Sequence, residues 1–413
     1  MRLARILLFL AAIVLASVLV YQIPAVNSRL AWRLDFARTS LRMWLNPAGA
    51  LPTAAAGQPT ATGEVAAVFP TATLRPPTAT PAPPTPTNEP SPTPLPSSAQ
   101  LPAPAWEQQG PNNCGPATLA LYLRTFGWEG DQYDISDLIK PESADRNVNV
   151  EELAFWSRNH AGWLSTHYRV GGDIETLKRF LANGLPIMIE EGTYLEETYW
   201  DNDDHWSGHY LLLTGYDDGA QTFTAQDTFL GPDRTVTYAQ LLEGWEQFNY
   251  VYIFLYLPHQ EATVQAILGE NWDPDVNRQN AQASAQAATE AAPDNPFAWF
   301  NLGSNLVYFE EYARAADAYD EARRLGLPQR MLRYQFGPFH AYFHSNRLDD
   351  LFVIVDYSLQ ITPNSEEALV WQGWGYYRQG DETQAIESFR EAYWHNVNSY
   401  DAQYALDYVG AAP

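Results

Sequence analysis

Hydrophobic and polar positions follow a helical period in the first part of the globular sequence and a strand-like period in the part that follows. Helical patterns occupy residues 115–127, 148–162 and 173–184, and a glycine ends the first and the third of them. Five strand-like runs come next, at residues 186–191, 209–218, 222–229, 234–239 and 250–258. Helices followed by a sheet predict an α+β domain over residues 106–258.

The remaining residues, 259–413, have helical periodicity and an internal repeat. Small and aromatic residues recur in the order small, aromatic, small, at Ala315, Tyr319 and Ala322 and again at Ala385, Phe389 and Ala392. Leu302 and Gly303 lie where one helix of a pair would pack on the next. Over residues 296–398 the spacing of about 34 residues resembles that of tetratricopeptide repeats. We expect an all-α solenoid whose stacked helix pairs share one core.

An uncharged apolar run covers residues 6–26 and follows two arginines. About 20 apolar residues are needed to span a bilayer, so the sequence predicts that residues 1–26 form a transmembrane anchor. A cleaved signal peptide is the alternative interpretation, although no convincing cleavage site follows the run. Four further arginines come after it, and by the positive-inside rule they argue against export of the chain.

Residues 27–105 are predicted to form a juxtamembrane segment and a disordered linker. Residues 51–105 hold 15 of the 30 prolines and 10 threonines. Proline removes a hydrogen-bond donor and fixes φ, so this composition favours an extended stalk over a packed core. Because such stalks commonly lift a domain from a membrane, we expect a single-pass protein of the cell membrane with extracytoplasmic globular domains.

Charge and cysteine content exclude several classes of function. The formal net charge is −25, and residues 1–105 carry seven basic and three acidic side chains, so the acidic excess lies in residues 106–413. An acidic surface repels phosphate and argues against nucleic-acid binding. The single cysteine forbids an internal disulfide and excludes zinc sites built on paired thiolates.

That cysteine, Cys114, stands where a Gly/Pro/Asn loop turns into the first predicted helix. Unpaired N–H groups and the helix dipole favour a thiolate at such a position. A nucleophilic thiol also needs a base, an orienting group for that base and a donor for the oxyanion. His209 at the head of a strand, Asp227 in the following strand and Gln108 are the candidates for these roles.

Each candidate has a rival. A lone cysteine at a helix start is often only a small buried residue. His205 is an alternative base, and Gln109 competes with Gln108. Asp217 and Asp218 precede a glycine and indicate a hairpin turn, so Asp227 is the preferred orienting residue.

An acidic segment, residues 190–204, precedes the candidate base. It contains seven carboxylates, at Glu190, Glu191, Glu196, Glu197, Asp201, Asp203 and Asp204. This segment could select basic substrate side chains or hold Ca²⁺, but its spacing fits no EF-hand loop. An exposed acidic loop without a ligand is the simpler interpretation.

Together these motifs resemble the papain-like cysteine peptidases, and within them the bacteriocin-processing (double-glycine) peptidase family. The matching residues are Gln108, 113–118, 171–190, 208–218 and Asp227. The resemblance implies Cys114 as nucleophile, His209 as base, Asp227 as orienting residue and Gln108 as oxyanion donor. Family members that mature bacteriocins sit on ATP-driven exporters, whereas this chain has no phosphate-binding loop, so cleavage after a double-glycine leader is not implied.

The sequence thus predicts a membrane-anchored cysteine peptidase that hydrolyses peptide bonds through an acyl-enzyme. A thiolate with an imidazole needs neither a metal nor another cofactor. The repeats are expected to recruit a peptide or protein substrate or a protein partner. Two alternatives remain open: an acyl or amide transferase that uses the same thiol, and a catalytically inactive scaffold.

Overall fold

The computed structural model describes residues 15, 20–21, 24–54, 94–142 and 145–413. Most of the predicted anchor over residues 1–26 lies outside these residues, and so does most of the predicted linker, namely residues 55–93. Within the described part of the chain, no helix combines the length and the apolar character needed to cross a bilayer.

A seven-stranded antiparallel sheet forms the centre of the α+β domain. Its strands are β1 (Ser98–Gln100), β2 (Ser165–Arg169), β3 (Ile187–Tyr194), β4 (Trp206–Asp217), β5 (Thr222–Asp227), β6 (Gly231–Thr237) and β7 (Tyr252–Tyr256). Six strands follow the order β2-β7-β3-β4-β5-β6, and β1 pairs with the end of β4 that extends beyond β3. The long strand β4 therefore organises the sheet, and the candidate base His209 lies on it.

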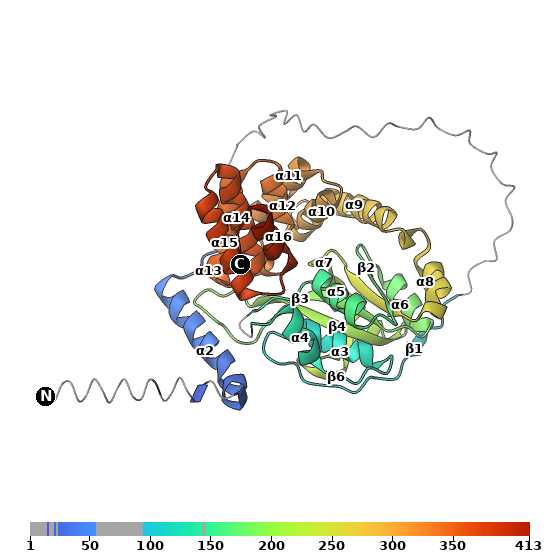
Figure 1. The fold of residues 1–413 in the computed structure, drawn as a ribbon. Coiled ribbons are helices and arrows are strands. Elements are labelled where there is room, and N and C mark those ends of the chain that lie inside the picture. The colour runs from blue at the N-terminus through green and yellow to red at the C-terminus, as the bar shows by residue number, and fades with distance from the viewer. Residues whose placement is uncertain (1–14, 16–19, 22–23, 55–93, 143–144) are drawn as a thin grey trace.

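Helices cover both faces of this sheet (Figure 1). One face packs on α3 (Cys114–Arg124), α4 (Gln132–Ile139) and α5 (Val150–His160), and the other on α6 (Ile174–Ala182), α7 (Tyr238–Glu246) and α8 (Glu261–Leu268). Alternate residues of β4 enter the two cores, with Leu212 on the α3 side and Leu211 and Leu213 on the α6 side. This alternation follows from the two-residue period of a strand.

The predicted helices and strands of the α+β domain are all present, but four elements were not predicted. The helices α4 and α7 begin with capping boxes, at Asp131 and Thr237 respectively. Because Thr237 caps α7, the strand expected over residues 234–239 ends at Thr237 and the chain turns helical. The short strands β1 and β2 lack the alternation of apolar and polar residues that marks the longer strands.

The α+β domain is longer than the predicted 106–258. On its N-terminal side β1 extends the sheet to residues 98–100, which were predicted to belong to the linker. On its C-terminal side Val264, Ile267 and Leu268 of α8 are buried in the core beside α6, although these residues were predicted to belong to the repeats. A helix of eight residues carries too little pattern to reveal which domain it joins.

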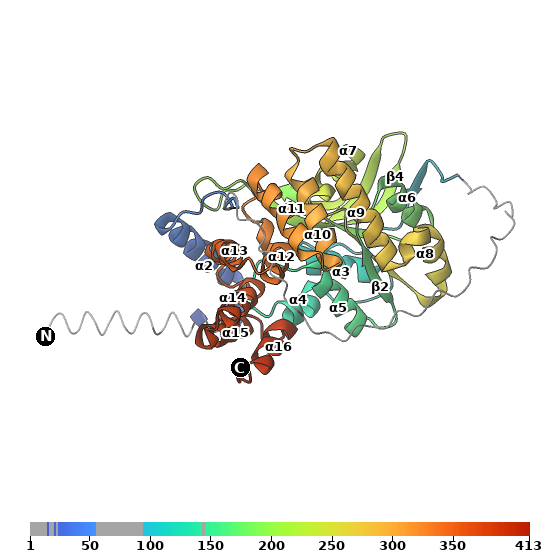
Figure 2. The ribbon, with the colours of Figure 1, turned by 90° about the horizontal axis from the view of Figure 1, so that it is seen from above.

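The remaining helices form an arc along one side of the α+β domain (Figure 2). They are α9 (Pro274–Ala291), α10 (Pro296–Tyr308), α11 (Tyr312–Leu325), α12 (Gly337–His344), α13 (Leu348–Ile361), α14 (Glu366–Gln379), α15 (Glu382–His395) and α16 (Tyr400–Tyr408). Consecutive helices pair as hairpins, and all six predicted small and aromatic positions are buried. A Cβ at Gly303 would lie 2.7 Å from the Tyr319 ring, so glycine is what lets α10 and α11 approach this closely.

The described part of the predicted juxtamembrane segment is ordered against these helices. Met43 near the end of helix α2 (Pro24–Leu45) is buried in the core of the helical domain, and so are Ala48 and Leu51, which follow the helix. The Tyr357 hydroxyl donates to the Gly49 carbonyl at 3.1 Å. The sequence did not reveal this packing, because the few apolar residues of 43–52 follow no regular period.

The acidic segment is one of the places where the helical domain docks on the α+β domain. Arg330 donates to Asp203 at 2.6 Å and to the Trp206 carbonyl at 2.8 Å, and its guanidinium lies 4.2 Å from the centre of the Trp200 ring. The Gln329 backbone N–H donates to Asp204. Expecting an exposed loop was therefore wrong for Asp203 and Asp204.

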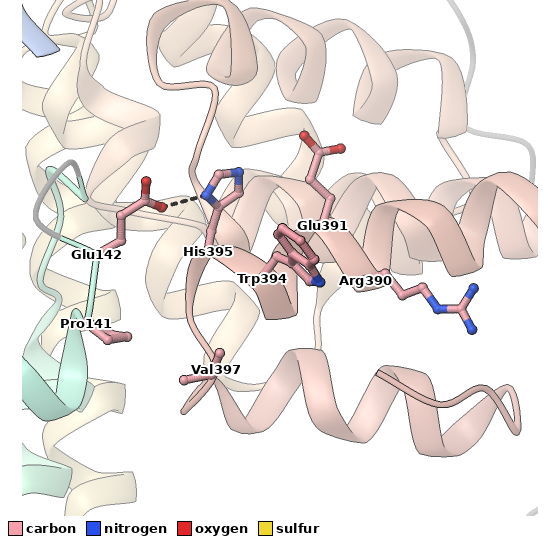
Figure 3. Close-up of a pocket in the computed structure, with 7 residues that line it drawn as sticks. All are labelled: Pro141, Glu142, Arg390, Glu391, Trp394, His395 and Val397. Carbon is pink, nitrogen blue, oxygen red and sulfur yellow. Dashed lines mark hydrogen bonds and ion pairs between the residues drawn. The ribbon is translucent and has the colours of Figure 1, made fainter. Parts of the chain in front are cut away.

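Another contact joins the end of α4 and the segment after it to the end of α15. Asn396 donates to the Ile139 carbonyl at 3.0 Å, and His395 forms an ion pair with Glu142 at 2.6 Å. Figure 3 shows these last two side chains pointing toward each other at the edge of a cavity of about 670 Å³. The residues that line this cavity include none of the candidate catalytic residues.

Candidate active site

Cys114 is the first residue of α3 and is half-buried. The next residue, Gly115, packs so tightly that a Cβ there would lie 3.3 Å from both Leu153 and Tyr210. Pro116 lies in the first turn, where a missing N–H costs no intrahelical hydrogen bond. The thiol is therefore held at a helix N-terminus that is fixed against β4 and α5.

Two buried side chains hold the loop that precedes Cys114. The side-chain oxygen of Gln132 accepts from the Gly110 backbone N–H at 2.6 Å and from the Asn113 side-chain amide at 2.8 Å. The side-chain amide of Gln132 donates to the Gln108 backbone carbonyl at 2.9 Å. The Lys140 ammonium donates to the Asn112 carbonyl at 2.7 Å. These four bonds fix the backbone immediately before the thiol.

His209 and Asp227 meet across the antiparallel pair β4–β5. Asp227 pairs with Leu211, so its side chain lies on the same face as that of His209, two residues earlier. The Nε2 atom of His209 lies 2.9 Å from Asp227 Oδ1. The same carboxylate oxygen accepts from the N–H groups of Phe229 and Leu230, at 2.8 and 3.0 Å. Asp227 is thus held in place by three donors.

The electrostatics favour a protonated imidazole beside an ionised carboxylate. Burial lowers the pKa of His209, but hydrogen bonds and charge interactions with Asp227 and Cys114 outweigh it and raise the pKa to about 10. Burial raises the pKa of Asp227, but the His209 interaction and the two backbone N–H groups bring it below its usual value. Since Nε2 faces Asp227, the Nδ1 atom of His209 is the one left for the thiol.

Two further carboxyl groups border this trio, and both lie on β3. Burial raises the pKa of Glu190 well above its usual range, opposed by a hydrogen bond with Tyr210 and reinforced by the Cys114 charge. Burial raises the pKa of Glu191 to about 7; the charge of His209 lowers it and that of Asp227 raises it. Burial therefore favours the neutral form of Glu190, and the pKa of Glu191 lies at about 7.

Gln108 lies near this trio, but its side chain points elsewhere. Its amide donates to the Phe229 carbonyl at 2.9 Å, and the side chain is exposed to solvent. The rival Gln109 accepts from the Thr228 hydroxyl at 2.9 Å through its side-chain oxygen. Both glutamines thus contact the segment that follows Asp227.

The other rivals lie apart from the thiol. His205 precedes β4, and its Nδ1 atom lies 2.9 Å from the Leu195 carbonyl. Asp217 ends β4 at the opposite end from His209 and accepts from the Ala220 N–H of the hairpin turn. Asp218 pairs with Lys178 at 2.9 Å. The structure therefore brings together Cys114, His209 and Asp227 rather than their rivals.

Sequence reasoning missed Gln132, Lys140 and the position of Glu191. Gln132 and Lys140 lie at the two ends of the short helix α4, which was itself not predicted. Glu191 was the last residue of the predicted strand 186–191 and also part of the acidic segment, and β3 continues beyond it to Tyr194. What the sequence did not give is the register that pairs Glu191 with His209 across β3 and β4.

The α+β domain is similar to a family of peptidases. Residues 97–253 match the Peptidase_C39 like family. Among solved structures, a putative C39-like peptidase from Bacillus anthracis shares 17% identity and has a TM-score of 0.31; the match covers 38% of this chain and 97% of that chain. Xylellain, a cysteine protease from Xylella fastidiosa, shares 15% identity with a TM-score of 0.30, covering 40% and 87%. No curated protein matches the chain significantly.

The family match supports a peptidase-type function for the α+β domain and a papain-like, C39-like fold with an antiparallel sheet. The match ends before α8, so it does not include the helices that follow.

Proposed function

We propose that the α+β domain is a cysteine peptidase in which Cys114 is the nucleophile, His209 the general base and acid, and Asp227 the residue that orients the imidazole. One observation carries this proposal. The 2.9 Å contact between His209 Nε2 and Asp227 Oδ1 leaves the other ring nitrogen for Cys114 at the N-terminus of α3. The match of residues 97–253 to a peptidase family supports the same chemistry.

The reaction proceeds in two halves. The Cys114 thiolate attacks the carbonyl carbon of a peptide bond, and His209 then gives its proton to the leaving nitrogen as the C–N bond breaks. Water next attacks the resulting thioester while His209 takes one of its protons. The C–S bond breaks, the carboxylic acid leaves and the thiolate is restored. Asp227 remains ionised and stabilises the imidazolium in both halves.

The oxyanion of each tetrahedral intermediate requires hydrogen-bond donors. The Cys114 backbone N–H, at the start of α3, is one donor of the kind that such sites use. Gln108 would supply the second after turning its exposed amide away from the Phe229 carbonyl. Gln132 and Lys140 hold the intervening backbone in place, which keeps both donors and the thiol in one arrangement.

The single cysteine makes the decisive experiment simple, because a thiol-directed label can react only at Cys114. We expect iodoacetamide to alkylate the wild-type protein at pH 6 much faster than it alkylates a free thiol, and the His209→Ala variant to lose this advantage. Cys114→Ser should lower turnover of fluorescent casein about a thousandfold or more. A thiol with ordinary reactivity and no turnover would refute the peptidase and leave an inactive scaffold.

A transferase would form the same acyl-enzyme as a hydrolase, so only the reaction products distinguish the two enzymes. Mass spectrometry of the products with and without glycinamide makes this distinction. Exclusive release of free carboxylic acids in both conditions supports hydrolysis. Transfer to glycinamide in preference to water would favour the transferase.

We further propose a membrane-tethered, extracytoplasmic protein whose C-terminal helices are tetratricopeptide-like repeats that recruit substrate or a partner. The apolar run at residues 6–26 and the proline-rich stretch support the tether. The hairpin pairing and the Gly303–Tyr319 packing support the repeats. Protease treatment of intact cells tests the orientation: cleavage of the repeats supports it, and full protection contradicts it.

A further inference from the structure

The stretch of β4 that carries His209 has a neighbouring strand on one side only. The strand β3 pairs with β4 over residues 206–213, whereas β5 pairs with β4 only from Leu211 onward. Within the described part of the chain, no strand lies along the other edge of residues 206–210. A strand segment with few backbone hydrogen bonds moves more easily than one that is paired on both sides. The position of the His209 backbone therefore depends also on contacts from outside the sheet.

The helical domain supplies such contacts to the first two residues of β4. They come from the segment around the 3₁₀ helix η3 (Met331–Arg333), which lies between α11 and α12. Arg330 donates to the Trp206 carbonyl at 2.8 Å, and the Tyr334 hydroxyl oxygen lies 2.9 Å from that of Ser207. Two consecutive residues of β4, shortly before the base, are thus bonded to the other domain.

The Tyr334 ring reaches the next residue of β4 as well. A Cβ at Gly208 would lie 3.0 Å from the Tyr334 ring and 2.9 Å from that of Phe248, so glycine is what allows this contact. The Tyr334 ring also packs edge-to-face on Trp206 and Phe248, with ring centres 5.7 and 6.0 Å apart. Trp206 and Phe248 are themselves buried and stack on each other. A side chain of the helical domain therefore packs directly on the residue that precedes His209.

The residue after Tyr334, Gln335, fixes the same segment to the loop that follows α7. Its side-chain amide donates to the Gln247 backbone carbonyl at 2.8 Å. The Gln247 side-chain oxygen accepts from the Trp206 indole N–H, so this glutamine contacts both β4 and the helical domain. Trp206 is 1% exposed and Gln247 is 4% exposed, and close packing around them leaves the Tyr334 ring little room to shift.

We propose that Tyr334 is a positioning residue for the peptidase reaction. Through Ser207 and Gly208 it fixes the end of β4, and this sets the distance from the His209 imidazole to the thiol. The inference rests on the function proposed above. A displacement of about 1 Å in a catalytic arrangement can cost about a hundredfold in rate. Because the family match ends at residue 253, Tyr334 lies outside the matched region, and its role makes catalysis depend on the docked helical domain.

Substitution of Tyr334 in the full chain tests the inference through turnover of fluorescent casein and the pH dependence of Cys114 alkylation by iodoacetamide. Tyr334→Ala should lower kcat about tenfold or more with little change in KM. It should also move the onset of alkylation to higher pH, because a displaced imidazolium stabilises the thiolate less. Tyr334→Phe keeps the ring on Gly208 and should lower kcat only about threefold. Ser207→Ala should match Tyr334→Phe, since each removes one side of the same hydroxyl contact.

The matched control is Tyr312→Ala, which removes another half-buried tyrosine of the helical domain, one whose ring stacks on His344. It should leave kcat and the alkylation profile unchanged even where it lowers the melting temperature. Equal losses in the two alanine variants, or wild-type behaviour of Tyr334→Ala, would overturn the inference and leave the peptidase intact. Should Tyr334→Ala not fold, wild-type kcat in both Tyr334→Phe and Ser207→Ala would overturn it. A wild-type thiol of ordinary reactivity would instead refute the peptidase, and this inference with it.

Discussion

Glu191 lies directly across from His209 in the antiparallel pair β3–β4. Residues paired in this way point to the same face of a sheet, with Cβ atoms about 5 Å apart. On this face Glu191 also approaches α7, where a Cβ at Gly244 would lie 3.1 Å from Glu191 Oε2. His209 thus has two carboxylates beside it: Asp227 accepts its hydrogen bond, and Glu191 faces it from the neighbouring strand.

The pH dependence of the peptidase reaction should report this second carboxylate. His209 has a pKa of about 10, so the active ion pair is lost on the alkaline side as the pH approaches that value. Glu191, with a pKa of about 7, is ionised there and stabilises the imidazolium. Glu191→Gln should therefore move the alkaline limb of kcat/KM to lower pH, by up to about one unit.

The control for this experiment is Glu243→Gln, an exposed carboxylate on α7 next to Gly244. It should leave the profile unchanged. An alkaline limb that stays in place in Glu191→Gln would show that Glu191 does not act on the imidazole. A uniform loss of rate at every pH would instead indicate a structural effect.

The orienting role of Asp227 predicts that its substitution lowers kcat/KM more than substitution of Glu191 does. Asp227→Asn keeps the shape of the side chain but removes the negative charge that supports the imidazolium. We expect kcat/KM to fall about a hundredfold or more, and the reactivity of Cys114 toward iodoacetamide at pH 6 to fall with it. An asparagine variant with wild-type labelling and turnover would exclude Asp227 from the site.

Alanine substitutions distinguish the roles of the neighbouring residues Gln108 and Gln109. Gln108→Ala should lower kcat about a hundredfold with little change in KM, because an oxyanion donor acts mainly in the transition state. Gln109→Ala serves as the matched variant, since the Gln109 side chain is held by the Thr228 hydroxyl and has only a local structural contact. A greater loss in Gln109→Ala would transfer the role to Gln109.

Local sequence patterns were sufficient to predict much of the candidate site. The helix after Cys114 and the strands around His209 and Asp227 follow from short-range periodicity, and antiparallel pairing then brings His209 and Asp227 together. Gln132 could not be found in this way, because its four hydrogen bonds depend on how a short helix packs on the preceding loop. A single glutamine carries no pattern that reveals such packing.

Domain docking was still harder to predict. The bond between Arg330 and Asp203 joins residues 127 positions apart, and neither lies in a regular pattern that marks the other as its partner. The acidic segment was therefore interpreted from its composition alone. A segment rich in acidic residues is ordinarily exposed to water. Its composition cannot show that a distant arginine pairs with one of its carboxylates and buries it.

The close approach of α10 and α11 predicts that Gly303 tolerates no side chain. The Cβ of Gly303→Ala would lie 2.7 Å from the fully buried Tyr319 ring, and the packed helices on both sides leave little room to relax. We expect a loss of about 1–3 kcal/mol in the free energy of unfolding, measured with urea. Gly162→Ala is the control, since its Cβ would meet only the Arg158 carbonyl, at 3.8 Å. Equal stability of the two variants would contradict tight packing at Gly303.

The buried contact of Arg330 predicts how strongly the two domains depend on each other. The Arg330 side chain is 2% exposed and that of Asp203 is fully buried, so removal of the guanidinium leaves an uncompensated carboxylate in the interface. Arg330→Ala should lower the free energy of unfolding by about 3–5 kcal/mol. Arg324→Ala, whose side chain is largely exposed, should have no measurable effect. Adding Asp203→Asn to Arg330→Ala should restore part of the loss, because the stranded charge is then gone. If the double variant loses as much free energy of unfolding as the two single variants lose together, the pair does not couple the domains.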